Sequence, residues 1–131
     1  MAKENINLEI ETQVLGSLAQ AYSGLEQYDN IIEYHKQSLN IMQELQDRKG
    51  EAEALCNLGV TFAKMQQYRE AEENLKAALG ICRDIENYST EVYILENLAM
   101  LYCQLNNHNS AKEYCKQGLN LHTKLYQIRF S

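Results

Sequence analysis

A repeat of fixed length constrains this sequence more than any other feature. Residues 54–81 read ALCNLGVTFAKMQQYREAEENLKAALGI, and a variant of this stretch occurs 40 residues earlier and again 40 residues later. The aligned positions keep their size and polarity in all three copies: Leu15, Leu55 and Leu95; Leu18, Leu58 and Leu98; Ala19, Gly59 and Ala99; Tyr22, Phe62 and Tyr102; Leu39, Leu79 and Leu119. Because no insertion or deletion interrupts the alignment, the period indicates a stacked array of supersecondary units.

The array has three units, 12–51, 52–91 and 92–131, within one predicted domain, 1–131. In each unit the apolar residues follow helical spacing, and a short break separates two helices. The predicted helices cover about 8–24, 29–45, 50–65, 68–85, 90–105 and 109–127, and Asp29 is predicted to cap the second. Residues 1–7 are polar and predicted to be frayed. The fold class is therefore all-α, built from helical hairpins that bury their apolar faces by stacking.

Composition supports this interpretation and excludes several function classes. The chain contains no proline, which fits helices joined by short turns. Its net charge is −6 and it has no basic stripe, so we expect no nucleic-acid partner. The amino-terminal stretch has no apolar run that could serve as a signal peptide, and the sequence has no apolar run of about 18 residues, so we expect no signal peptide, no membrane span and a cytoplasmic location.

The residues that usually carry chemistry are scattered. The four cysteines form no CxxC pair and have no histidine spaced to complete a zinc site: Cys56, Cys82, Cys103 and Cys115. The three histidines lie far apart, without a nucleophile or carboxylate at triad spacing: His35, His108 and His122. Glycine-rich phosphate loops are also absent from the sequence. We therefore expect no enzyme activity, no metal site and no cofactor.

Small and bulky side chains recur in a fixed order within each unit. Ala19, Gly59 and Ala99 are predicted to face the small residues Ala71 and Ala111, which lets two helices approach closely, and the aromatic column then fills the space beside the crossing. This order of a bulky residue, Leu-Gly, Tyr, Ala and Ala-Leu resembles the tetratricopeptide repeat over residues 12–131. The resemblance implies a right-handed α/α superhelical solenoid of three helix-turn-helix hairpins.

Some features depart from the familiar pattern. The repeat has 40 residues instead of about 34 and lacks the proline near its end, and in this it is similar to the repeats of kinesin light chains and of bacterial signalling scaffolds. The glycine expected at the hairpin turn is replaced by Glu26, Gln66 and Asn106, so the turn must avoid a positive φ or accept strain. HEAT repeats have a similar period but lack this order of residues.

In the tetratricopeptide family the first helix of each repeat lines a concave groove. The resemblance therefore implies a peptide-binding groove made by positions off the buried stripe: Gln13, Ser17, Gln20, Gly24, Glu53, Asn57, Val60, Lys64, Tyr93, Glu96, Asn97, Met100 and Gln104. Asn57 and Asn97 are in register, and their amides can donate to and accept from the backbone of an extended peptide. In the alternative, these asparagines only bond water or cap neighbouring helices.

Two further expectations concern the ligand of this groove. Tyr93 and Met100 are predicted to form an apolar pocket, while Glu53 and Glu96 are predicted to favour a neutral or basic protein or peptide. Capture of a free chaperone-tail carboxylate is not expected. The columns that carry its cationic clamp in the family hold Glu53, Cys56, Tyr93 and Glu96 in this sequence.

The carboxyl-terminal stretch carries apolar residues without an evident capping helix: Leu121, Leu125, Ile128 and Phe130. Since arrays of this kind normally end in a helix with a polar outer face, we expect one of three situations. The sequence is a piece of a longer repeat domain, two copies cover each other's ends as a homodimer, or the exposure is harmless. The leading hypothesis is a non-catalytic protein-interaction module; the alternatives are a self-associating assembly unit and a sensory segment of a larger signalling protein.

Overall fold

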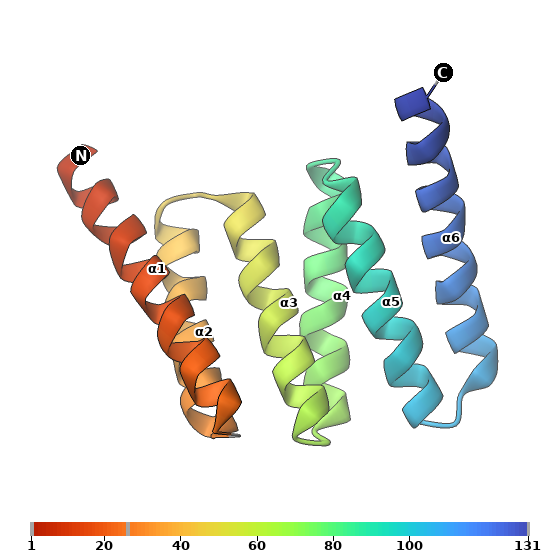
Figure 1. The fold of residues 1–131 in the computed structure, drawn as a ribbon, viewed down its shortest axis with the longest axis horizontal. Coiled ribbons are helices and arrows are strands. Elements are labelled where there is room, and N and C mark those ends of the chain that lie inside the picture. The colour runs from red at the N-terminus through yellow and green to blue at the C-terminus, as the bar shows by residue number, and fades with distance from the viewer. Residues whose placement is uncertain (1, 26, 131) are drawn as a thin grey trace.

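The computed structural model describes residues 2–25 and 27–130, and these form six α-helices without a strand. The helices are α1 (Ala2–Gly24), α2 (Tyr28–Glu44), α3 (Arg48–Lys64), α4 (Tyr68–Asp84), α5 (Tyr88–Gln104) and α6 (His108–Phe130). Each helix packs against the next, and α3 also contacts α5. Figure 1 shows α1, α3 and α5 nearer the viewer, with α2 and α4 behind them. The prediction of an all-α solenoid made of three hairpins is confirmed.

The four described junctions at 45–47, 65–67, 85–87 and 105–107 share one turn geometry. In the turn after α3, the Gln66 N–H donates to Ala63 O (3.0 Å) and the Gln67 N–H donates to Phe62 O (2.9 Å). This pair of hydrogen bonds is the Schellman motif, whose middle residue is left-handed. That residue has φ of 56°, 61°, 57° and 59° at Gln46, Gln66, Glu86 and Asn106, respectively. The hairpin turns at Gln66 and Asn106 therefore accept a positive φ without glycine, while Glu26 lies outside the described residues.

The helix starts differ from the predicted ones by two or more residues in several places. Gln27, not Asp29, is the N-cap of α2, and Asp29 lies in the first turn, where the helix dipole favours an acid. Helix α3 starts at Arg48 because the Asp47 carboxylate accepts a hydrogen bond from the Gly50 N–H (2.9 Å). Residues 2–7, which were expected to be frayed, are helical, since no proline or glycine interrupts the backbone there.

A close crossing of α3 and α4 lies at the centre of the core. A Cβ on Gly59 would be 2.6 Å from Leu75 Cγ and 3.2 Å from the Ala71 carbonyl oxygen, so this position excludes alanine as long as Leu75 stays in place. The first and third hairpins have alanine at this position, and opposite it they have His35 and Cys115 in place of the leucine. The predicted close approach of a small residue and a bulky one is confirmed at this crossing.

The aromatic column beside the crossing is also confirmed. Tyr22 stacks on Tyr34 with ring centroids 5.7 Å apart, and Tyr102 stacks on Tyr114 at 5.5 Å. In the middle hairpin Phe62 occupies this column and packs partly buried against the main core. Such stacked rings stabilise a hairpin beyond the area that they bury.

Candidate peptide-binding groove

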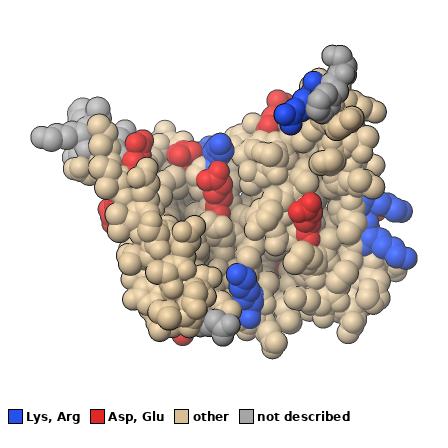
Figure 2. All heavy atoms as spheres, in the orientation of Figure 1, with Lys and Arg blue, Asp and Glu red and all other residues tan. Residues whose placement is uncertain are grey.

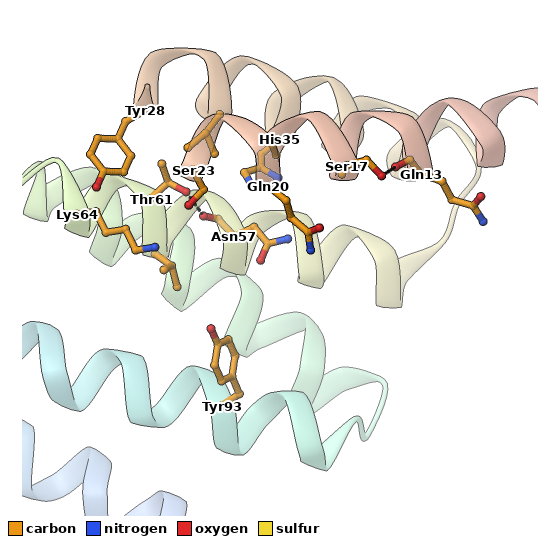
Figure 3. A pocket seen from close by; sticks show the side chains of 14 residues that line it. Gln13, Ser17, Gln20, Ser23, Tyr28, His35, Asn57, Thr61, Lys64 and Tyr93 are labelled. Atoms are coloured by element: carbon orange, nitrogen blue, oxygen red, sulfur yellow. Dashed lines mark hydrogen bonds between the residues drawn. The ribbon is translucent and has the colours of Figure 1, made fainter. Parts of the chain in front are cut away.

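A hollow of about 610 Å³ opens between the first two hairpins. Its walls come from α1, α2 and α3, and Tyr93 of α5 closes one side (Figure 3). The lining residues are Gln13, Gly16, Ser17, Ala19, Gln20, Ser23, Tyr28, Ile31, His35, Asn57, Val60, Thr61, Lys64 and Tyr93. The hollow is thus built by the helices that the family resemblance assigns to the groove, together with one helix of the other layer.

The free polar groups of this hollow include side-chain amides. The Thr61 hydroxyl donates to the Asn57 carbonyl oxygen (2.8 Å) and the Ser17 hydroxyl donates to the Gln13 carbonyl oxygen (3.1 Å), so both hydroxyls are engaged by their own helices. Within the described residues, no hydrogen bond engages the side-chain amides of Asn57 and Gln20. These groups offer both a donor and an acceptor to a polypeptide backbone.

Lys64 and His35 are the ionisable side chains of the hollow besides its two tyrosines. Burial lowers the pKa of His35, because desolvation disfavours the charged imidazolium. His35 is therefore neutral at pH 7, when it can donate from one ring nitrogen and accept at the other. The wall thus combines amides, a neutral imidazole and one ammonium group, and no carboxylate belongs to the lining.

Seven of the predicted groove residues line this hollow: Gln13, Ser17, Gln20, Asn57, Val60, Lys64 and Tyr93. Glu53 lines a neighbouring hollow of about 340 Å³, which it shares with Asn57 and Tyr93. Asn97 lines neither of these two hollows, and its side-chain N–H donates to the Tyr93 carbonyl oxygen (2.8 Å). The two asparagines that are in register therefore differ, because only the Asn57 amide is unengaged.

Two ligand expectations are not supported by this arrangement. Met100 lines a different groove from Tyr93, so the structure does not bring these two predicted pocket residues together. The residues are seven positions apart on α5, which places them roughly 10 Å apart along the helix axis. Glu53 and Glu96 both lie outside the main hollow, and its charged wall residue is Lys64, so the expected preference for a basic ligand has no basis there.

The lining residues that the prediction missed are Gly16, Ala19, Ser23, Tyr28, Ile31, His35 and Thr61. The prediction considered only the first helix of each repeat, whereas α2 supplies three of these residues. Ser23 carries a usable signal, since it lies three positions after Gln20 on the same helical face. His35 carries a second signal, because it is a polar residue at the position where the second hairpin has the buried Leu75.

A second groove, of about 830 Å³, lies on α5 and α6 and is mostly apolar. Its lining includes three predicted residues, Glu96, Met100 and Gln104, with the rest being Val92, Ala99, Cys103, Tyr114, Cys115, Gly118, Leu119 and His122. We call it the α5–α6 groove. Of the predicted self-association residues whose side chains the structure describes, Leu121, Leu125 and Ile128, none lines it. Leu121 is half-buried against the core and Leu125 is half-buried, Ile128 is exposed, and the side chain of Phe130 lies outside the described part of the structure.

The described residues offer little to metal or redox chemistry. All four cysteines are free, and burial raises the pKa of the Cys56 thiol to about 12 and also raises that of Cys82. No group of three or more His, Cys, Asp or Glu side chains in residues 2–25 and 27–130 is arranged to hold a metal ion. Among the helices described, none is both long enough and apolar enough to cross a membrane.

Family models decide the relationship that the repeat pattern indicates. A model described as tetratricopeptide repeat matches residues 11–84, and a second model with the same description matches residues 92–129. The chain belongs to the tetratricopeptide repeat family. The finer similarity to the kinesin light chain variant stays a prediction. No curated protein matches this sequence at a significant level.

Solved structures share the fold of this tetratricopeptide array at low sequence identity. The TPR domain of Arabidopsis FLU is 20% identical with a TM-score of 0.81, and the match covers 88% of this chain and 98% of that domain. Aspartyl phosphate phosphatase F from Bacillus subtilis is 18% identical with a TM-score of 0.82, covering 87% of this chain but 30% of the phosphatase. A Rap protein complexed with Competence and Sporulation Factor is 22% identical with a TM-score of 0.74, covering 88% and 31% of the two chains.

Proposed function

We propose that this chain is a protein-interaction module that binds an extended polypeptide in the hollow between its first two hairpins. The family supports a protein-interaction role in general, and its fold is generally that of a non-catalytic module. The single observation that supports binding of a polypeptide at this place is the hollow of about 610 Å³, whose wall presents the unengaged amides of Gln20 and Asn57.

An extended peptide suits this wall because it offers a backbone N–H and a C=O at every residue. The side-chain amides of Gln20 on α1 and Asn57 on α3 lie near each other in the view of Figure 3, so a strand that passes them meets donors and acceptors from both helices. Tyr93 supplies an aromatic surface for one side chain, and Lys64 favours an acidic or neutral side chain next to it. We therefore propose a neutral or weakly acidic peptide as the ligand class. A neighbour with this fold, the Rap protein, holds a partner, which supports a binding role for such arrays.

The first experiment selects ligands from a phage-displayed library of random dodecapeptides and measures the best peptide by fluorescence anisotropy. Asn57→Ala removes the hydrogen bonds that this side chain makes with the peptide, so it should raise the Kd for the peptide about tenfold. Asn97→Ala should change the Kd less, because the side-chain N–H of Asn97 already donates to the Tyr93 carbonyl oxygen. Asn40→Ala is the matched control, because Asn40 is an exposed asparagine of α2 outside the hollow.

Stability serves as a second readout for the same variants. Asn57 is exposed, so its replacement should shift the Tm by less than a few degrees, and any loss of binding then reports the groove. A library that enriches no peptide whose binding depends on Asn57 or Tyr93 would place the interaction on another surface of the array.

A further inference from the structure

In the part of the chain that the structure describes, one apolar face is exposed at each end of the array, and the two faces correspond to the two sides of an internal interface. The α5–α6 groove lies 40 residues after the surface of α3 and α4 that α5 covers. Leu79 is 5% exposed on the covered surface, whereas its counterpart Leu119 is 66% exposed in the groove. Cys82 is fully buried, whereas its counterpart His122 is exposed. The α5–α6 groove is therefore shaped like a surface that receives a further first helix of a repeat.

Helix α1 carries the residues that such a surface receives. Ile94 and Leu98 of α5 are fully buried where α5 meets the preceding hairpin. Their counterparts on α1 are Val14 and Leu18, which are 52% and 36% exposed. Ile10 precedes Val14 by one helical turn and is also exposed, so the stripe continues along the same face. Helix α1 thus presents outward the apolar residues that α5 inserts.

The two ends also carry opposite charge. Helix α1 contains one lysine and three glutamates, for a net charge of −2, whereas α6 contains four basic residues and one acid, for a net charge of +3. Figure 2 shows Lys and Arg side chains gathered at the α6 edge of the array. Glu11 of α1 aligns with Glu51 and Glu91 in the repeat. Glu51 accepts a hydrogen bond from Gln43, and Glu91 accepts one from Arg83, in each case from the preceding helix. Attraction between unlike ends favours their contact, while two α6 ends would repel.

We infer that the α5–α6 groove binds helix α1 of a second copy of this chain, so that the stack of hairpins continues from molecule to molecule. This inference goes beyond the proposed peptide binding and uses none of the amides of that hollow. The contact is heterologous, because its two sides are different surfaces, and such contacts build rings or open stacks instead of closed two-fold dimers. It also differs from association through Leu121, Leu125, Ile128 and Phe130, since the apolar groove lies between α5 and α6.

Sedimentation equilibrium over a concentration series is the primary test. The average mass of the chain should rise above its 15.1 kDa monomer mass as the concentration increases. Val14→Asp and Leu119→Asp each place a carboxylate in one side of the contact, so each should raise the concentration needed for association by about tenfold or more. Ile128→Asp is the matched control, because Ile128 is an exposed apolar residue of α6 outside the groove. It should leave association unchanged.

Mixing separates a head-to-tail contact from every symmetric one. The Val14→Asp variant keeps an intact α5–α6 groove and the Leu119→Asp variant keeps an intact α1. At a concentration where the wild-type chain associates, each variant alone should be mostly monomeric, and an equimolar mixture should form a heterodimer and grow no further. That result also proves that both variants are folded. A wild-type chain that stays monomeric at all concentrations, a mixture that stays monomeric, or a loss of association in Ile128→Asp would each overturn the inference.

Thiol labelling gives an independent readout on the unmodified chain. Cys103 and Cys115 are exposed and line the α5–α6 groove, whereas Cys56 and Cys82 are buried in the core. An aromatic disulfide reagent should react quickly with two thiols in dilute solution, and this reaction should slow as the protein concentration rises and α1 of a second copy covers the groove. Labelling that stays equally fast at concentrations where the mass has doubled would place the contact elsewhere and contradict the inference.

Discussion

The second and third hairpins share one backbone plan but differ in their surroundings. Both begin with a helix of 17 residues, α3 or α5, and both turn through a left-handed middle residue. The second hairpin has a neighbour on each side, so Leu79 is buried, whereas no helix of the described chain covers Leu119 of the third. The pattern of a repeat identifies the side chains that are built to stack, and the presence of a neighbour decides whether they are buried.

The largest expected effect comes from replacing Leu79 of the second hairpin with alanine, compared with the same change at its counterpart Leu119 in the third. Leu79→Ala removes a buried side chain and leaves a cavity, so it should lower the free energy of unfolding by about 2–5 kcal/mol. Leu119→Ala acts on an exposed residue and should lower it by less than about 0.5 kcal/mol. Urea unfolding of dilute protein, followed by circular dichroism, measures both changes. Similar losses in the two variants would mean that the third hairpin is covered in solution.

The helix crossing provides the next contrast. Gly59→Ala brings a Cβ to 2.6 Å from Leu75 Cγ and should lower the free energy of unfolding by about 1–3 kcal/mol. Gly80→Ala, on the exposed side of α4 with no atom within 4 Å of the new Cβ, should raise it by about 0.5–1 kcal/mol through helix propensity. Leu75→Cys reproduces the pair of the third hairpin, so the double variant with Gly59→Ala should lose less than the sum of the singles. Additive losses would show that the crossing relaxes in another way.

The turns of the two hairpins differ in the side chain at the left-handed position. Gln66→Gly should raise the free energy of unfolding by about 0.5–1 kcal/mol, because glycine adopts a positive φ without steric strain. Asn106→Gly should gain less, since asparagine tolerates this region better than glutamine does. Thermal unfolding of the two variants in parallel measures the difference, and an equal gain would indicate that the two turns carry the same strain.

The smallest effect extends the comparison to the first hairpin, where His35 holds the column of Leu75 and Cys115. Burial lowers the pKa of His35 in the folded chain, so the unfolded chain binds a proton first as the pH falls. Stability from this residue is complete above the unfolded pKa of about 6.5 and is lost as the pH falls below it. The Tm should therefore drop between pH 7.5 and pH 5 by more in the wild-type chain than in His35→Asn. Equal drops would assign the acid sensitivity to other groups.

Local pattern predicted most of the fold but less of the candidate site. Helical spacing placed all six helices, since each helix buries one face, and the column of Ala19, Gly59 and Ala99 identified the crossings. The helix starts were missed by a few residues, because the turn after each helix depends on backbone hydrogen bonds that any residue can make. His35 was missed in the hollow because its position there depends on how α2 lies against α1 and α3.

The matched pair at the crossing has a consequence for how this array can change over time. Gly59 has no Cβ and so leaves room for Leu75, whereas the third hairpin combines Ala99 with the smaller Cys115. The residue on one helix is therefore suited to the residue on the other helix of the same hairpin. Recombination that joins α1 or α5 to α4 would set an alanine Cβ against Leu75, whereas a splice in the turn between two hairpins keeps every pair together. The hairpin, and not the single helix, is therefore the piece by which a gene for such an array can be lengthened or shuffled.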